Sequence, residues 1–192
     1  IDGGVLRLND SLAGPVTVAG SGTLAGSATL AGGLNVLSGG RLRLAIDGGT
    51  HDRFVAPTAS VSGGTLQLDL IAPAPIGSTI ELVDVSGPAA VNGVFANVAE
   101  GGFLHDGDTG YRLSYVGGDG NDITLTALRV PLPPQNLVAT PGNAQLSLSF
   151  TPPAANGSGT VTGYRAQCMP GNVSSDAPQS PIVVSGLNNG VA

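Results

Sequence analysis

Two histidine–aspartate neighbours are the residues of this sequence that come closest to acid–base chemistry. His51 precedes Asp52, and His105 precedes Asp106. A hydrolytic triad also needs an activated serine, typically in a strained Gly-x-Ser-x-Gly turn, and the sequence has no such turn. We therefore predict that both histidines are exposed turn residues without a catalytic role.

Polysaccharide cleavage is a second possibility, because it needs two carboxylates that converge on one face beside basic or aromatic side chains. Asp47, Asp52 and Asp69 are the available carboxylates. Their spacing does not match the 18-residue repeat described below, the chain has no Lys or Trp, and aromatic residues make up 4% of it. The sequence therefore predicts a protein that is not an enzyme and has no catalytic residues.

A third candidate is the glycine-rich segment 117–122, Gly-Gly-Asp-Gly-Asn-Asp. It resembles the start of the calcium-binding nonapeptide of RTX proteins, in which turn carbonyls and Asp hold the ion. The segment occurs once, and Thr124 stands where the RTX pattern has a large apolar residue. We therefore predict a hairpin turn and no cofactor, while calcium binding by Asp119 and Asp122 stays open.

The composition favours an all-β protein with an aliphatic core. Gly and Pro, 31 and 14 of the 192 residues, interrupt the chain so often that an ordinary helix of about 11 residues has no room. The net charge is −6 and all seven basic residues are Arg, which argues against nucleic-acid binding. No apolar run is long enough for a membrane span, and we expect the sequence to be an internal part of a longer protein.

The elements that must position these candidates follow an 18-residue repeat. Leu6, Leu24 and Leu42 are separated by this step, and each follows a turn of small residues. The same step relates a second column: Val18, Val36 and Phe54. Apolar and polar residues alternate within each repeat, which is typical of short strands.

The repeat predicts a parallel β-helix, or solenoid, in which each coil lies on the one before and both columns point inward. About seven coils, each adding roughly 4.8 Å, would fit residues 1–128 and form a rod-shaped spacer. A β-sandwich with a chance repeat is the alternative. After Ile46 the step lengthens, residues 101–110 are expected to form a loop, and strands on both sides of residues 117–122 predict a hairpin that closes the solenoid.

Three segments of residues 1–128 resemble the passenger-type β-strand repeats of bacterial autotransporters. They are residues 52–55, residues 61–66 with their Gly-Gly-Thr-Leu step, and residues 115–125. The resemblance implies a secreted or surface-displayed β-helical stalk. It indicates architecture and export more than any chemistry.

A proline-rich linker, residues 129–135, is predicted to separate the repeats from a second domain, residues 136–192. Four alternating segments there predict separate strands: residues 136–139, 146–150, 161–167 and 182–184. Their pattern resembles a bacterial fibronectin type III module, with Phe150 where that family often has Trp. Because such an immunoglobulin-like sandwich needs about 100 residues, we expect this one to be incomplete and to lack its last two strands.

The expected function is structural. A rod-like repeat region that carries a fibronectin type III module would serve as the adhesive, non-catalytic part of an extracellular or cell-surface bacterial protein, associated with the outer membrane. Its partner would be an extracellular protein or polysaccharide, with no nucleic acid involved and no membrane span in these residues. The alternative is a non-catalytic accessory region of a secreted carbohydrate-active enzyme.

Cys168 is the single cysteine, and it ends the predicted third strand of the second domain. Some bacterial modules that this domain resembles carry a cysteine on the strand that lies beside the third one. The resemblance therefore implies a disulfide from Cys168 to a residue within about ten positions after Ala192, facing the gap left by the missing strand. A small buried side chain that never pairs is the alternative.

Overall fold

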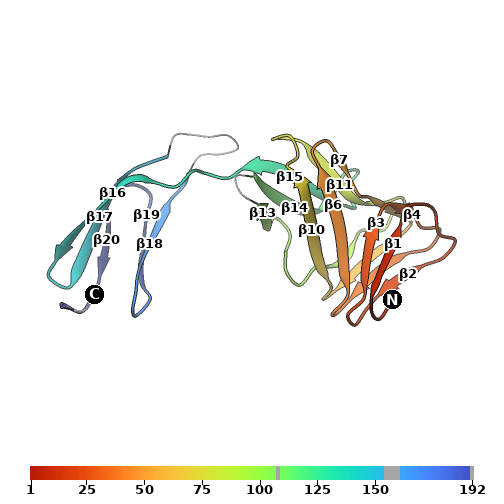
Figure 1. Ribbon diagram of the computed structural model, residues 1–192, viewed down its shortest axis with the longest axis horizontal. Coiled ribbons are helices and arrows are strands. Elements are labelled where there is room, and N and C mark those ends of the chain that lie inside the picture. The colour runs from red at the N-terminus through yellow and green to blue at the C-terminus, as the bar shows by residue number, and fades with distance from the viewer. Residues whose placement is uncertain (107–108, 154–160, 191–192) are drawn as a thin grey trace. The chain divides into compact units, whose positions relative to one another are not determined.

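The computed structural model describes residues 1–106, 109–153 and 161–190. In these residues the protein is all-β, as predicted, with twenty strands in five sheets (Figure 1). The described part of the chain contains no helix able to cross a membrane. The chain divides into two compact units, Ile1–Leu128 and Arg129–Ala192, and the division falls at the first residue of the predicted linker.

Three sheets build the first unit, and each takes strands from successive repeats. The first sheet contains β1 (Val5–Leu8), β3 (Thr23–Gly26), β6 (Arg41–Asp47), β10 (Thr65–Ala72) and the short β7 (Thr50–His51). The second contains β2 (Val16–Val18), β5 (Leu34–Leu37), β9 (Ala59–Ser62) and β12 (Asn92–Val94). The third contains β4 (Ala28–Thr29), β8 (Phe54–Ala56), β11 (Thr79–Val85), β15 (Asp122–Arg129), β14 (Thr109–Gly117) and β13 (Phe103–Asp106).

The predicted leucine column is confirmed by the strand register. Leu6 lies beside Leu24, and Leu24 lies beside Leu42, in parallel pairings that keep the step seen in the sequence. The column continues to Leu66 on β10. Leu24 and Leu42 are fully buried, whereas Leu6, at the end of the column, is 36% exposed. A constant repeat length thus returns the same apolar position to the same face in the first three repeats, and the longer step to Leu66 keeps that alignment.

The predicted position of Phe54 is wrong. Val18 lies beside Val36, as expected, but the next member of that column is Val61, which comes later in the chain than the constant step predicts. Phe54 belongs to the third sheet, where it lies between Ala28 and Val83. The reason is a hairpin between β6 and β7, which adds residues to the third repeat and displaces everything after it.

The first unit stacks four repeats, so the prediction of about seven is also wrong. The first and second sheets each contain four parallel strands, because the later repeats are longer and the described residues after Phe95 add no further parallel strand to either sheet. These later residues build β13, β14 and β15, of which β13 replaces part of the loop expected at residues 101–110. The expected hairpin around residues 117–122 is present, since β14 and β15 are hydrogen-bonded neighbours.

β14 covers the end of the last repeat. The Tyr111 hydroxyl accepts a hydrogen bond from the Ala74 amide, 3.0 Å away, just after β10. The Tyr115 hydroxyl accepts one from the Phe95 amide and donates one to the Val98 carbonyl, both just after β12. Burial raises the pKa of the Tyr115 hydroxyl above its ordinary value. These bonds connect the third sheet to the ends of the other two.

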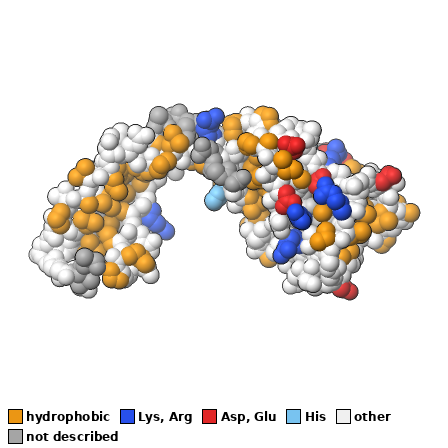
Figure 2. Space-filling model, viewed as in Figure 1, with side chains coloured by type: hydrophobic (Ala, Val, Ile, Leu, Met, Phe, Trp, Pro, Cys, Tyr) orange, Lys and Arg blue, Asp and Glu red, His pale blue; other side chains and the backbone are white. Residues whose placement is uncertain are grey.

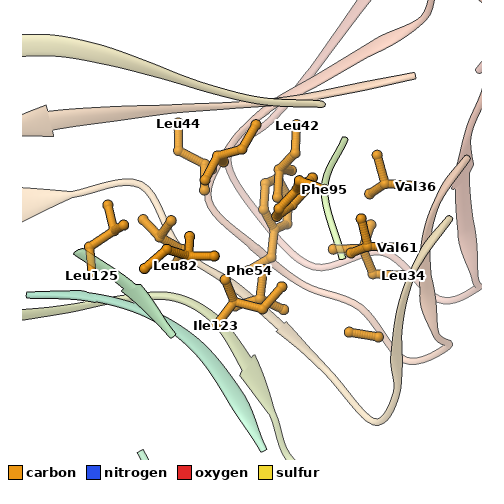
Figure 3. Packing of buried hydrophobic residues seen from close by; sticks show 14 of the residues in the cluster. Leu34, Val36, Leu42, Leu44, Phe54, Val61, Leu82, Phe95, Ile123 and Leu125 are labelled. Atoms are coloured by element: carbon orange, nitrogen blue, oxygen red, sulfur yellow. The ribbon is translucent and has the colours of Figure 1, made fainter. Parts of the chain in front are cut away.

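The three sheets share one aliphatic core. Figure 3 shows Leu42 and Leu44 of β6, Val36 of β5 and Phe54 of β8 pointing toward one another. All four side chains are at most 1% exposed. Successive side chains of a strand point to opposite faces, and along β6 every second residue is therefore buried while those between are exposed or half-buried.

The second unit holds five strands in two small sheets. The larger sheet contains β16 (Gln135–Gly142), β17 (Gln145–Thr151) and β20 (Ile182–Ser185), and the smaller contains β18 (Tyr164–Cys168) and β19 (Val173–Ala177). Every described pairing in both sheets is antiparallel. β18 begins at Tyr164 instead of at the predicted residue 161, and β19 was not predicted because its sequence is largely polar. The buried core consists of Ala166, Ile182 and Val184.

Candidate functional site

The two histidines lie in strands, which corrects the prediction that they occupy turns. His51 is on β7, half-buried and opposite Ile46, because the chain needs only residues 48 and 49 to turn back onto β6. His105 is on β13 and exposed. The backbone of Asp106 ends β13, and its side chain lies outside the described residues. The two histidines belong to different sheets, so they do not form a common site.

The three candidate carboxylates have different partners. Asp52 accepts a hydrogen bond from the Ala45 amide at 3.0 Å, which fastens the end of the β6–β7 hairpin. Asp69 lies on β10, where its carboxylate is 2.6 Å from the Arg43 guanidinium. Asp47 is exposed at the hairpin turn. Asp52 and Asp69 thus each support a contact between strands.

A different charged group forms on the third sheet, around Arg53. The Arg53 guanidinium is 2.8 Å from Glu81 and also contacts Asp84 on β11. These contacts link Arg53, which directly precedes β8, to β11, the parallel strand beside β8. Figure 2 shows acidic and basic side chains close together on the visible face of the first unit. We call Arg53, Glu81, Asp84 and Asp122 the Arg53 cluster.

Asp122 joins this cluster from the hairpin between β14 and β15. The residue is 3% exposed, and its carboxylate accepts a hydrogen bond from the Val85 amide at 2.7 Å. Its second oxygen faces the Asp119 amide at 3.4 Å. A side chain at Gly118 would overlap the Asp122 carboxylate, so glycine is required for this close approach.

The contacts of Asp122 are relevant to the calcium binding that the sequence left open for Asp119 and Asp122. Its two oxygens accept backbone amide hydrogens within the protein, and Asp119 is exposed. In the described residues, no three His, Cys, Asp or Glu side chains are grouped so that they could hold a metal ion. The contacts of Asp122 are those of a residue that fastens the hairpin to β11.

The surroundings of Glu81 change its acidity. Burial raises its pKa above the ordinary 4.5, and a hydrogen bond with Asp122 and the charges of Asp122 and Asp84 raise it further. Arg53 opposes this effect. Paired carboxylates of glycosidases stand about 5–9.5 Å apart to admit a sugar and a water. Glu81 and Asp122 instead contact each other directly, so their arrangement does not have that spacing.

The raised pKa predicts an unusual pH dependence of stability. Because the folded protein favours protonated Glu81, its stabilising contribution is complete below pH 4.5 and is lost as pH rises through the raised pKa. Glu81→Gln stays neutral at every pH. We therefore expect the melting temperature of Glu81→Gln, measured relative to the unchanged protein, to rise by a few degrees between pH 4 and pH 7.

Asp10→Asn is the control, because it removes a carboxylate from an exposed turn, where Asp10 accepts a hydrogen bond from the adjacent amide of Ser11. Its melting temperature relative to the unchanged protein, measured over the same range, is the reference for Glu81→Gln. Parallel pH profiles for Glu81→Gln and Asp10→Asn would show that Glu81 has no special role.

Cys168 lies at the end of β18, opposite Val173 on β19. It is a free thiol, half-buried, and it lines a hollow of about 550 Å³ together with Leu187 and Asn188. In the described residues, β19 is the only strand paired with β18, so the other edge of β18 is unpaired. A disulfide from Cys168 to a residue beyond Ala192 stays a prediction.

The Arg53 cluster was missed by sequence reasoning. Its contacts join residues that are distant in the sequence, with a separation of 31 residues for Arg53 and Asp84 and of 37 residues for Val85 and Asp122. A usable signal was present, because Glu81 and Arg53 are charged residues in or beside strongly apolar strands. Such residues face outward on alternating strands and meet when the strands stack.

Two comparisons with known proteins do not assign this chain to a family. No protein-family model matches the chain, and no curated protein matches its sequence. The resemblance to autotransporter repeats and to fibronectin type III modules therefore rests on the residues that carry it.

Proposed function

We propose that residues 1–128 form a parallel β-solenoid and that residues 136–192 belong to a fibronectin type III module, joined by a linker at residues 129–135. Together they serve as a non-catalytic structural and adhesive region of a secreted or surface-displayed bacterial protein. The partner is an extracellular protein or polysaccharide.

One observation carries the solenoid proposal: parallel strands on two different sheets keep the same register step from one repeat to the next. Leu6, Leu24 and Leu42 follow this step on the first sheet, and Val18 and Val36 follow it on the second. A sandwich of antiparallel hairpins pairs neighbouring segments of the chain and does not produce such a step. Coils that stack with a constant register produce the same step between parallel strands on every face of the solenoid.

The strand pairing of the second unit supports the proposal of a fibronectin type III module. β16, β17 and β20 form one antiparallel sheet, and β18 and β19 form another. Immunoglobulin-like sandwiches contain two antiparallel sheets, with strands that cross between them. The ion pairs Arg43–Asp69 and Arg53–Asp84 support a non-catalytic role, because each links neighbouring strands.

The adhesive role is tested by binding. We expect the purified chain to bind saturably to an immobilised matrix protein, such as collagen or laminin, and to release no reducing sugar from cellulose or xylan. Val184→Asp should abolish binding, because Val184 is fully buried in the second core. The matched control is Val183→Asp, since its neighbour Val183 is 43% exposed on the opposite face of β20.

Each other outcome has a definite meaning. Sugar release would overturn the non-catalytic assignment. Saturable binding to cellulose or xylan alone would identify the partner as a polysaccharide, which both the adhesive region and the accessory region of a carbohydrate-active enzyme allow. Binding to none of these surfaces would reject the adhesive role.

A further inference from the structure

Three of the seven arginines lie on the outer face of the first sheet. Arg7 is on β1, and Arg41 and Arg43 are on β6. On both strands they alternate with leucines that face the core, so their side chains point to the opposite, outer face. Figure 2 shows basic side chains on the visible face of the first unit, over the area where Figure 1 places β3, β6 and β10. We call Arg7, Arg41 and Arg43, together with Gln67 of β10, the arginine face.

The strand register sets the spacing of these side chains. Arg7 lies beside Ala25, and Ala25 lies beside Arg43, so the two arginines are separated by two strand spacings, roughly 9.6 Å. Gln67 continues this row on the other side of Arg43. Arg41 precedes Arg43 on the same face of β6, about 7 Å away. Because the Ala25 side chain is short, a gap separates Arg7 from Arg43, and a third arginine lies beside the row.

Most of the hydrogen-bond donors of these arginines are unused. Arg41 is exposed, and in the described part of the chain no hydrogen bond or ion pair engages its side chain. Arg43 contacts Asp69 through Nε at 2.6 Å, which leaves both of its Nη groups without a partner among the described residues. Arg7 is 4.0 Å from Asp52, at the outer limit of an ion pair. Since each guanidinium carries five N–H donors, the arginine face can bind further acceptors.

The chemistry of these donors favours a carboxylate, which a guanidinium can bind through two parallel hydrogen bonds. The distance between Arg7 and Arg43 is about the length of a disaccharide in an extended polysaccharide, so the pair matches a chain with one carboxylate per disaccharide. Gln67 is exposed and supplies an amide for a sugar hydroxyl. A densely charged polymer, such as a nucleic acid or a sulfated polysaccharide, fits less well. The chain has a net charge of −6, and Asp52 and Asp69 lie next to the arginines.

We propose that the arginine face binds an unsulfated acidic polysaccharide with one uronic acid per disaccharide. The polysaccharide lies across the strands, with its carboxylates on Arg7 and Arg43 and with Arg41 beside them. This inference adds a contact site to the proposed adhesive region and does not depend on the fibronectin type III module, because the arginine face belongs to the first unit.

Surface plasmon resonance on immobilised hyaluronan tests the proposal, since hyaluronan has this pattern of carboxylates. We expect saturable binding that weakens as the salt concentration rises, because salt screens ionic contacts. Arg41→Gln should weaken binding by about tenfold, through the loss of charge-assisted hydrogen bonds. Its melting temperature should equal that of the unchanged protein, because the Arg41 side chain has no partner in the described residues. Arg165→Gln is the matched control: it removes the same charge from an exposed arginine of the second unit and should leave binding unchanged.

Four results would overturn the proposal. The first is the absence of saturable binding to hyaluronan, and the second is an equal loss of binding in Arg41→Gln and Arg165→Gln. The third is unchanged binding to hyaluronan whose carboxylates are methyl-esterified. The fourth is tighter binding to heparin or to single-stranded DNA than to hyaluronan, which would assign the arginine face to a densely charged polymer.

Val184→Asp separates this site from the contact proposed for the second unit. It should leave hyaluronan binding unchanged, because Val184 is buried in the core of the other unit. Binding to collagen or laminin without binding to hyaluronan would refute only this further inference. Hyaluronan binding that Arg41→Gln weakens, together with no binding to collagen, laminin, cellulose or xylan, would refute only the contact proposed for the second unit.

Discussion

Leu42→Ala is expected to lower the free energy of unfolding by about 2–5 kcal/mol. Leu42 is fully buried, and it lies between Leu24 and Leu66 in the middle of the leucine column. Neighbours on both sides are held by their own strands, so they cannot collapse fully into the space that the side chain leaves. Urea unfolding followed by circular dichroism measures the effect.

Leu6→Ala is the matched control, because Leu6 belongs to the same column but is 36% exposed at its end. Its substitution should cost about 1 kcal/mol or less, since partly exposed apolar groups lose less on truncation. Equal losses for Leu42→Ala and Leu6→Ala would contradict the stacked column.

Gly40→Ala is expected to destabilise the protein by about 1–3 kcal/mol, because any side chain at this position is overpacked. A Cβ at Gly40 would overlap the carbonyl oxygen of Val18 and come within 2.7 Å of its carbonyl carbon. These are backbone atoms of the preceding repeat, so they cannot rotate away. The Gly40 carbonyl also accepts the Thr65 amide of the following repeat at 2.9 Å, which holds the corner on both sides.

Gly49→Ala is the control for this substitution. A Cβ at Gly49 would meet no atom within 4 Å, and the residue does not have a positive φ. Alanine there should be neutral or slightly stabilising, because it reduces the entropy of the unfolded chain. Thermal melts of both variants provide the comparison, and a neutral Gly40→Ala would show that the repeats are not in close contact at this corner.

The parts of the fold that could be predicted are those with a local, periodic cause. Alternation of apolar and polar residues identifies strands such as β6, because successive side chains point to opposite faces. A constant step places Leu6, Leu24 and Leu42 side by side, since equal lengths of chain return to the same face. Glycines and prolines exclude helices for an equally local reason.

Phe54 was misplaced because turn geometry is ambiguous in sequence. Gly48 and Gly49 resemble the small-residue corners of the first repeats, such as Gly39 and Gly40. In the structure Gly48 and Gly49 form the turn of the β6–β7 hairpin, and the corner of this repeat comes later in the chain. A glycine pair permits both conformations at little cost, so packing against the neighbouring strands makes the choice.

Most strands, the repeat and the division of the chain at residue 129 follow from the amino-acid order alone. The number of stacked repeats, the place where β14 covers the last one and the charges that meet depend on three-dimensional packing. Arg53, Glu81 and Asp122 form one cluster because stacked strands lie about 4.8 Å apart, whatever their separation along the chain. The lengths of the intervening turns decide which residues of stacked strands lie side by side. These lengths do not follow the repeat, so the periodic pattern of the sequence does not predict them.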